Sequence, residues 1–196
     1  MTAVVEYDAG NIRSVIHALE RLGVADVVLT SDPAAIRAAD RVILPGVGDA
    51  SVVMASLRAA GLAEVVAALK QPVLGICAGM QILCEHSEEG DADGLGIFRT
   101  KVRRFRPADA SLKVPHMGWN SLQDMSGPLF EGLPRPAYAY FVHSFYADVC
   151  EDTVAICSHG GNFSAALRRE NFFGTQFHPE KSGPAGAAIL ANFIRL

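Results

Sequence analysis

The fold class follows from a strand-to-helix junction that reads Val73-Leu74-Gly75-Ile76-Cys77-Ala78-Gly79-Met80-Gln81. An apolar strand pattern ends at Ile76, and a helical pattern begins at Ala78. Glycines lie two residues before and two residues after Cys77, so the turn carries little bulk on either side. This is the layout of a nucleophile elbow with sulfur in place of oxygen. The alternative is a tight turn whose glycines only let the strand and helix pack closely.

The elbow interpretation also predicts reactivity at Cys77. A helix N-terminus carries a partial positive charge and N–H groups that lack helical acceptors. Both features favour the thiolate, which is the reactive form of cysteine. The backbone N–H of Ala78 is then well placed to stabilise an oxyanion.

Strand and helix patterns alternate through the first half of the chain, around this junction. Short apolar strands alternating with helices predict a parallel sheet covered on both faces. The second half has more strand patterns and Pro- and Gly-rich loops, which predict an antiparallel portion. The predicted strands are 3–6, 27–29, 41–44, 72–76, 97–105, 138–142, 145–149, 154–157, 163–168 and 173–177. The predicted helices are 11–22, 50–69 with an interruption near Gly61, 78–85 and 185–193.

Composition narrows the class of protein. The chain has 196 residues, half of them apolar, and a formal net charge of −4. This length predicts one domain over residues 1–196, and the composition excludes general disorder. The acidic balance argues against a nucleic-acid partner, and no apolar run approaches the ~20 residues of a membrane helix. The first residues do not resemble a signal peptide, so we expect a cytoplasmic protein without membrane association.

The cysteines show no C-x-x-C spacing, which argues against a zinc ribbon or a dithiol redox pair. We interpret Cys84, Cys150 and Cys157 as small core residues.

His178 and Glu180 are the best candidates to act with Cys77. They follow a predicted strand, and residues two apart in extended chain point to the same side. Glu180 can therefore orient the imidazole and leave its other nitrogen for the thiol. The alternatives are metal ligation, for which no third ligand has a recognisable spacing, and a purely structural turn.

The motif around Cys77 and the sequence Gln176-Phe177-His178-Pro179-Glu180 together resemble the class I, triad-type glutamine amidotransferases. The resemblance covers nearly the whole chain. It implies a three-layer α/β/α sandwich with a largely parallel central sheet and an antiparallel portion in the second half. It also implies hydrolysis of glutamine, with Cys77 as nucleophile, His178 as general base and then acid, and Glu180 as the orienting carboxylate. We predict neither a cofactor nor a metal.

Three further segments are similar to the glutaminase subunits of imidazole glycerol phosphate synthases. Residues 7–15 resemble their N-terminal D-Y-G-x-G-N-L-x-S segment, and residues 44–48 match their P-G-V-G loop. Residues 114–120, which read Val-Pro-His-Met-Gly-Trp-Asn, are the most discriminating match. This resemblance implies that ammonia passes to a separate (β/α)₈-barrel cyclase subunit in a heterodimer that makes imidazole glycerol phosphate for histidine biosynthesis.

The same resemblance assigns further roles. Val47 and Ala78 would form the oxyanion site. The glutamine pocket would contain Gly46, Gly48, Gln81, Glu89, His143, Ser144 and Phe145. The partner interface would contain Asn11, Trp119, Asn120 and Tyr140. For Glu89 the alternative is a solvated surface carboxylate, and for Trp119 it is a core aromatic.

Some positions depart from this pattern, and two other functions stay open. Glu6 stands where Asp is usual, Asp8-Ala9 replaces part of a glycine pattern, and Phe145 stands where Tyr is frequent. One alternative is the glutaminase subunit of pyridoxal phosphate synthase, against which residues 115–120 argue. The other is a non-catalytic redox or interaction protein with an elbow cysteine, which would not need Glu180 or Gln81.

Overall fold

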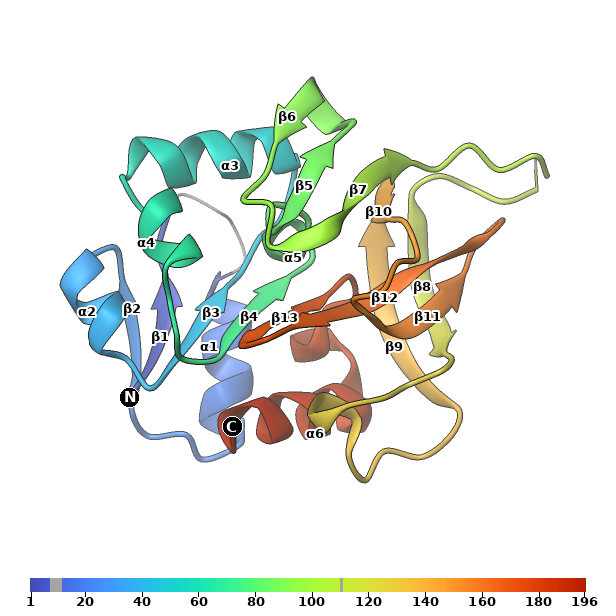
Figure 1. Cartoon of the computed structure of the whole chain (residues 1–196). Coiled ribbons are helices and arrows are strands. Elements are labelled where there is room, and N and C mark those ends of the chain that lie inside the picture. The colour runs from blue at the N-terminus through green and yellow to red at the C-terminus, as the bar shows by residue number, and fades with distance from the viewer. Residues whose placement is uncertain (8–11, 110) are drawn as a thin grey trace.

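The structure, a computed structural model, describes residues 1–7, 12–109 and 111–196 (Figure 1). Its described residues form a central sheet in the order β11-β12-β13-β4-β3-β1-β2. The five strands from β13 to β2 are parallel, whereas β12 and β11 continue the sheet in antiparallel pairing. The strands are β1 (Thr2–Val5), β2 (Val27–Thr30), β3 (Arg41–Leu44), β4 (Val73–Ile76), β11 (Thr153–Ser158), β12 (Asn162–Arg169) and β13 (Phe172–Thr175).

Helices cover both faces of this sheet (Figure 1). One face packs against α2 (Pro33–Ala38), α3 (Ala50–Ala59) and α4 (Ala63–Ala67). The other face packs against α1 (Ile12–Arg21) and α6 (Gly183–Ile194). Successive strand residues point to opposite faces, so Ala3 and Val5 enter the first core while Val4 enters the second. The predicted three-layer α/β/α sandwich with a mixed sheet is confirmed.

Two smaller sheets extend the antiparallel portion. One has the order β10-β7-β5-β6, and the other pairs β8 with β9. Their strands are β5 (Cys84–Ser87), β6 (Ala92–Asp93), β7 (Phe98–Arg104), β8 (His116–Leu122), β9 (Ala137–His143) and β10 (Phe145–Ala147). The short helices are α5 (Ala78–Gln81), η1 (Glu89–Asp91), η2 (Pro128–Phe130) and η3 (Pro179–Lys181).

The predicted helix 78–85 is wrong beyond its first turn. It ends at Gln81, and Cys84 begins strand β5, whose residues pair with β7. The apolar run through Cys84 is buried whether it is helical or extended, so its pattern does not distinguish the two. The predictions also lacked helix α2, which Asp32 caps by accepting a hydrogen bond from the N–H of Ala34 at 2.9 Å. Strand β8 was likewise not predicted.

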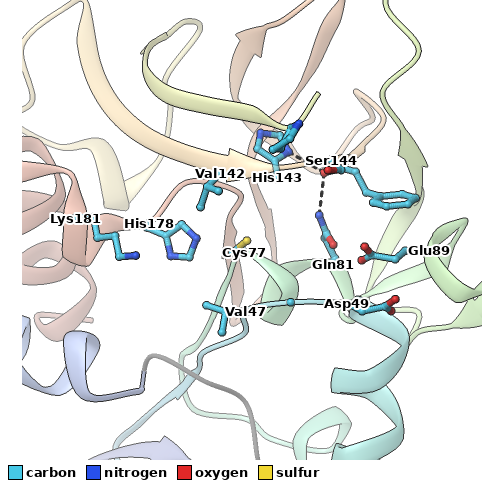
Figure 2. Close-up of a pocket in the computed structure, with 13 residues that line it drawn as sticks. Val47, Asp49, Cys77, Gln81, Glu89, Val142, His143, Ser144, His178 and Lys181 are labelled. Carbon is cyan, nitrogen blue, oxygen red and sulfur yellow. Dashed lines mark hydrogen bonds between the residues drawn. The ribbon is translucent and has the colours of Figure 1, made fainter. Parts of the chain in front are cut away.

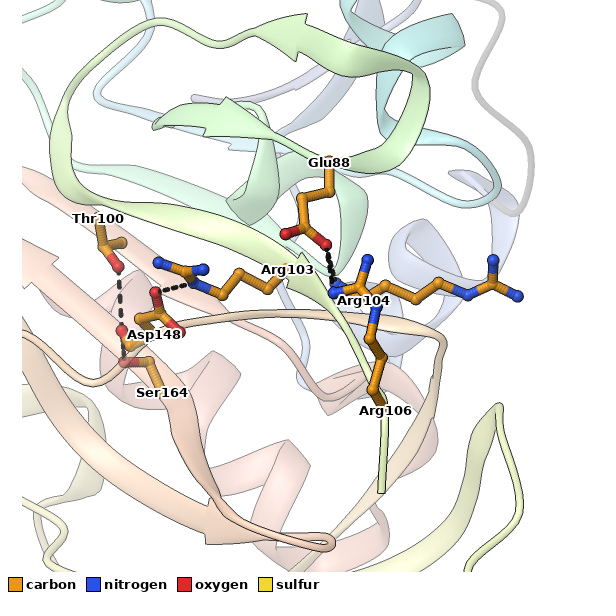
Figure 3. A network of polar contacts seen from close by, with 7 residues as sticks. All are labelled: Glu88, Thr100, Arg103, Arg104, Arg106, Asp148 and Ser164. Carbon is orange, nitrogen blue, oxygen red and sulfur yellow. Dashed lines mark hydrogen bonds and ion pairs between the residues drawn. The ribbon is translucent and has the colours of Figure 1, made fainter. Parts of the chain in front are cut away.

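Polar contacts fasten β7 to the elements beside it (Figure 3). The Glu88 carboxylate accepts hydrogen bonds from the backbone N–H of Arg104 and from the Arg106 guanidinium, each at 3.0 Å. The bond from the Arg104 backbone, and then the Arg106 guanidinium, lower the pKa of Glu88. The carbonyl oxygen of Asp148 accepts from the hydroxyls of Thr100 and Ser164 at 3.0 and 2.8 Å. These bonds fix β7, which pairs with β10, the strand that carries Phe145.

Across the described part of the chain, no helix has both the length and the apolar character needed to cross a membrane.

Candidate active site

Cys77 occupies a sharp turn between β4 and α5. Its backbone has a φ of +54°, an uncommon and costly value for a residue with a side chain. Close approach of two backbone segments explains the glycines. A Cβ atom on Gly79 would lie 2.0 Å from the carbonyl oxygen of Leu44, and one on Gly46 would lie 2.3 Å from the nitrogen of Gly79. The turn therefore sits against the end of β3, so the carboxyl ends of two neighbouring parallel strands meet here.

His178 lies beside Cys77 (Figure 2), and its ring contacts the Glu180 carboxylate. The distance from His178 Nδ1 to Glu180 Oε1 is 2.8 Å. The two side chains are only 2% and 1% exposed, so water does not compete for this contact. His178 Nε2 is buried and has no hydrogen-bond partner among the described residues. Figure 2 shows the imidazole directed toward the Cys77 sulfur.

The environment of His178 favours the protonated ring. Burial alone lowers its pKa, but the neighbouring Cys77 sulfur and the Glu180 carboxylate outweigh burial and raise the pKa to about 10. An imidazolium between a thiol and a carboxylate can both pair with a thiolate and donate a proton to a leaving group.

Hydrogen bonds also fix the backbone that carries His178. Its N–H donates to the carbonyl oxygen of Tyr140 in β9 at 3.0 Å. The Ser182 hydroxyl accepts from the N–H of Tyr140 at 2.9 Å and donates to the carbonyl oxygen of His178 at 2.7 Å. These bonds tie the segment between β13 and η3, which bears His178, to the β8-β9 sheet.

A cavity of about 610 Å³ opens over Cys77 and His178. Most of the predicted glutamine-pocket residues line it. The lining residues are Val47, Gly48, Asp49, Cys77, Gln81, Glu89, Pro115, Val142, His143, Ser144, Phe145, His178 and Lys181 (Figure 2). Gly46 does not line the cavity and lies instead against Ala78 and Gly79.

The amide of Gln81 is oriented by two acceptors. Its Nε2 donates to the carbonyl oxygen of Phe145 at 3.0 Å and to Gln176 Oε1 at 2.9 Å. Both amide hydrogens are therefore engaged, which leaves Gln81 Oε1 as an acceptor at the cavity. Gln176 in turn directs its Nε2 toward the Cys77 sulfur at 3.7 Å.

Glu89 places a carboxylate at the opposite end of the cavity from His178 (Figure 2). Its Oε2 accepts a hydrogen bond from the N–H of Ala50, at the start of α3, at 2.8 Å. Burial raises the pKa of Glu89, and the nearby Asp49 carboxylate acts in the same direction. A positively charged group in the cavity would therefore find an oriented acceptor at this end.

The loop after β3 reaches the cavity through Val47 and Gly48. Just before them, the carbonyl oxygen of Pro45 accepts a hydrogen bond from the buried hydroxyl of Tyr7. Burial raises the pKa of Tyr7 far above its usual value, so this side chain stays a neutral donor. Gly48 has a φ of +90°, a conformation open to glycine at little cost.

The predicted interface residues lie in three different settings. Trp119 is 57% exposed and packs edge-on against Tyr140, at a centroid separation of 6.2 Å. Asn120 instead directs its amide to His116 Nε2 and to the carbonyl oxygen of Ser158. Asn11 lies outside the described residues.

Sequence reasoning assigned no role to Gln176, Tyr7 or Lys181. A signal for Gln176 was available, because it lies two residues before His178, at the end of the predicted strand 173–177. Tyr7 begins the segment 7–15 that resembles the glutaminase subunits, but nothing in the sequence indicated its hydrogen-bond partner, which lies 38 positions away. Among the described residues, no group of three or more His, Cys, Asp or Glu side chains could hold a metal ion.

Comparison with known proteins gives consistent matches over the whole chain. A model of the family described as glutamine amidotransferase class-I matches residues 3–196. The imidazole glycerol phosphate synthase subunit HisH of Bacteroides fragilis is 53% identical over 194 residues, which cover 99% of this chain and 98% of that protein. The subunit of the same name from Xanthomonas axonopodis pv. citri is 51% identical over 199 residues, covering 100% and 98%.

A solved structure shares the fold. It is described as a putative GMP synthase subunit from Thermoplasma acidophilum, with a TM-score of 0.75 and 21% sequence identity. The match covers 100% of this chain and 92% of that chain.

Proposed function

Because this chain belongs to the class-I glutamine amidotransferase family, we propose that it hydrolyses L-glutamine and delivers the ammonia to a cyclase subunit. The cyclase would use the ammonia to make imidazole glycerol phosphate in histidine biosynthesis, as the names of the relatives suggest. The observation that carries the proposal is the buried contact between His178 and Glu180 behind an elbow cysteine. A redox or docking protein would have no need of that contact.

The first half of the reaction forms a thioester. His178 first takes the proton of the Cys77 thiol, which gives a thiolate beside an imidazolium. The Cys77 sulfur then attacks the side-chain amide carbon of glutamine, and the carbonyl oxygen becomes an oxyanion. The backbone N–H of Ala78 stabilises this oxyanion. The backbone N–H of Val47 does the same once its peptide bond has turned so that the N–H faces the cavity. The C–N bond then breaks while His178 donates its proton to the departing nitrogen, which releases ammonia.

The second half removes the glutamyl group. His178, now neutral, accepts a proton from water as the water oxygen attacks the thioester carbon. Glutamate leaves, and the proton on His178 restores the starting pair with Cys77. Glu180 holds the imidazole orientation through both halves and stabilises the cationic ring, since its carboxylate is 2.8 Å from Nδ1.

The polar ends of the cavity fit the two ends of glutamine. Glu89 offers a carboxylate to the substrate ammonium, and Gln81 Oε1 offers a further acceptor. Together with the walls at His143, Ser144 and Phe145, these groups would set the distance between the ammonium and the reacting amide. Their separate placement supports a substrate with a charged head and a neutral amide tail.

The partner surface would lie on the outer face of the β8-β9 sheet. Opposed pairing places Met117, Trp119 and Tyr138 on the same face, where they are 64%, 57% and 53% exposed. Three large exposed side chains side by side are typical of an interaction surface. Val142 belongs to this face and also lines the cavity, which gives ammonia a short route to a bound cyclase.

Ammonia release from glutamine tests the proposal. The measurement compares this chain alone with a mixture of this chain and a (β/α)₈-barrel cyclase. We expect low turnover alone, stimulation in the complex, and near-complete loss in Cys77→Ala with the complex intact. Full turnover by Cys77→Ala would exclude the mechanism. Binding to a pyridoxal phosphate synthase barrel instead would redirect the partner assignment.

A further inference from the structure

A line of hydrogen bonds runs along the inner face of the β8-β9 sheet to the cavity wall. Asn120 Nδ2 lies 3.2 Å from His116 Nε2, and His116 Nδ1 lies 2.9 Å from His143 Nε2. His143 Nδ1 lies 2.7 Å from the carbonyl oxygen of Phe145. His116 does not line the cavity, so it acts on the site only through its neighbours.

The Phe145 carbonyl at one end of the line and the Asn120 amide at the other determine which atom donates in each hydrogen bond. A carbonyl oxygen only accepts, so the proton of His143 must be on Nδ1, and its Nε2 must accept. His116 Nδ1 must then carry the proton that is donated to His143. His116 Nε2 in turn accepts from the Asn120 amide. One pair of neutral tautomers satisfies the whole line.

The surroundings keep both rings uncharged. Burial lowers the pKa of His143 to about 3 and the pKa of His116 to about 4, and the neighbouring His159 acts in the same direction. His159 stacks on His116 at a centroid separation of 4.3 Å, and aromatic rings, including Phe105 and Phe163, pack around the pair. No carboxylate is hydrogen-bonded or ion-paired with either ring in the described part of the chain.

The line continues past the cavity wall to the cysteine. The Phe145 carbonyl oxygen accepts from His143 and also from Gln81 Nε2 at 3.0 Å (Figure 2). Gln81 donates in addition to Gln176, whose amide reaches toward the Cys77 sulfur. The orientation of the Phe145 carbonyl therefore determines which atom Gln81 presents to the cavity.

We propose that His116 is a positioning residue for glutamine binding: it donates to His143, which holds the Phe145 carbonyl and so orients the cavity wall and Gln81. Asn120 supports His116 in this role from the same strand. The inference rests on the proposed function, because its catalytic readout is the binding of glutamine. Neither histidine side chain takes part in the bond-breaking steps.

Two variants at His116 distinguish the effect of its hydrogen-bond donor from the effect of its aromatic ring. His116→Phe keeps a planar ring but removes the donor, which leaves His143 Nε2 buried without a partner. His116→Asn restores a donor near the position of Nδ1. His17→Phe is the matched control, since His17 is an exposed histidine on α1 and does not belong to this line.

In the complex with the cyclase, we expect His116→Phe to raise KM for glutamine about tenfold or more, with kcat within about twofold. His116→Asn should return KM to within about threefold of the wild-type value, and His17→Phe should leave KM unchanged. A wild-type KM in His116→Phe, or an elevated KM in His116→Asn that equals that of His116→Phe, would overturn the proposal.

A measurement that does not involve glutamine makes the test independent of the proposed function. ¹⁵N-detected NMR of histidine-labelled wild-type protein reports which ring nitrogen carries the proton. We expect His143 to be protonated on Nδ1 in the wild type and in His116→Asn. A wild-type protein with the His143 proton on Nε2 would refute the positioning role, whatever the chain hydrolyses. Normal tautomers without any glutaminase activity would instead count against the proposed function alone.

Discussion

Replacing Glu180 with Gln tests the contact that distinguishes this site from a structural turn. The two side chains have nearly the same shape, so the variant retains an acceptor for His178 Nδ1 and loses only the negative charge. The contact is 2.8 Å long, and its partners are 2% and 1% exposed, so solvent screening does not weaken it. Hydrogen bonds to charged groups contribute about 1.5–3 kcal/mol, which corresponds to a roughly 10- to 150-fold change in rate.

We expect this loss in kcat and little change in KM. Glu180 does not line the cavity, so glutamine still binds, whereas the imidazolium that forms during turnover loses its carboxylate. Loss of the carboxylate also removes one of the two groups that raise the pKa of His178. His178 should therefore lose its proton at a lower pH in the variant than in the wild type.

The assay is steady-state ammonia release by the complex over a range of glutamine concentrations, with circular dichroism to verify folding. Glu64→Gln provides the matched control, because Glu64 is an exposed glutamate on α4. The control should retain wild-type kcat. A folded Glu180→Gln variant with kcat within about twofold of wild type would show that the carboxylate does not serve the histidine.

Three other predictions concern packing, the partner surface and pH. Gly79→Ala should destabilise the fold by about 2 kcal/mol or more in chemical denaturation, because its Cβ would overlap a backbone oxygen, whereas Gly161→Ala has open space and should be tolerated. Trp119→Ala should weaken cyclase binding about 30-fold by calorimetry, while Val52→Ala, exposed on another element, should not. The stability advantage of wild type over His178→Gln should be largest below pH 6.5 and shrink as pH rises through about 10, since the folded-state pKa is raised.

Each of these predictions has a contrary outcome. Equal stability of Gly79→Ala and Gly161→Ala would mean that the elbow does not need its close backbone approach. Equal cyclase affinities for Trp119→Ala and Val52→Ala would place the partner surface elsewhere. A stability difference between wild type and His178→Gln that grows toward pH 10.5 would contradict the direction of the His178 pKa shift.

Sequence reasoning succeeded where chemistry and local pattern coincide. The strand-to-helix turn at Cys77 needs small neighbours, and the glycines that supply them are visible in the sequence. His178 and Glu180 were predicted to be in contact, and the structure confirms the contact. The predicted extended geometry is wrong, because β13 ends at Thr175 and Glu180 lies in the 3₁₀ helix η3. The alternation of strands and helices was sufficient to predict the layered sheet.

The features that were missed depend on contacts between distant positions. Strand β8 carries the polar residues His116 and Asn120 on its inner face, and this pattern does not indicate a strand until their mutual hydrogen bonds are known. The role of Gln176 depends on Gln81, which lies 95 positions earlier in the chain. Strand β5 replaced a predicted helix because pairing with β7 outweighs the helical tendency of its residues.

The central claim is that Cys77 alone among the four free thiols is activated for attack on a glutamine-like carbon. Labelling the complex with a glutamine-mimicking chloroketone, followed by peptide mass spectrometry, tests it directly. The account predicts a single adduct on Cys77, slowed by added glutamine and absent from Cys77→Ala. Labelling confined to the other three cysteines, or labelling of Cys77 that glutamine does not slow, would contradict it.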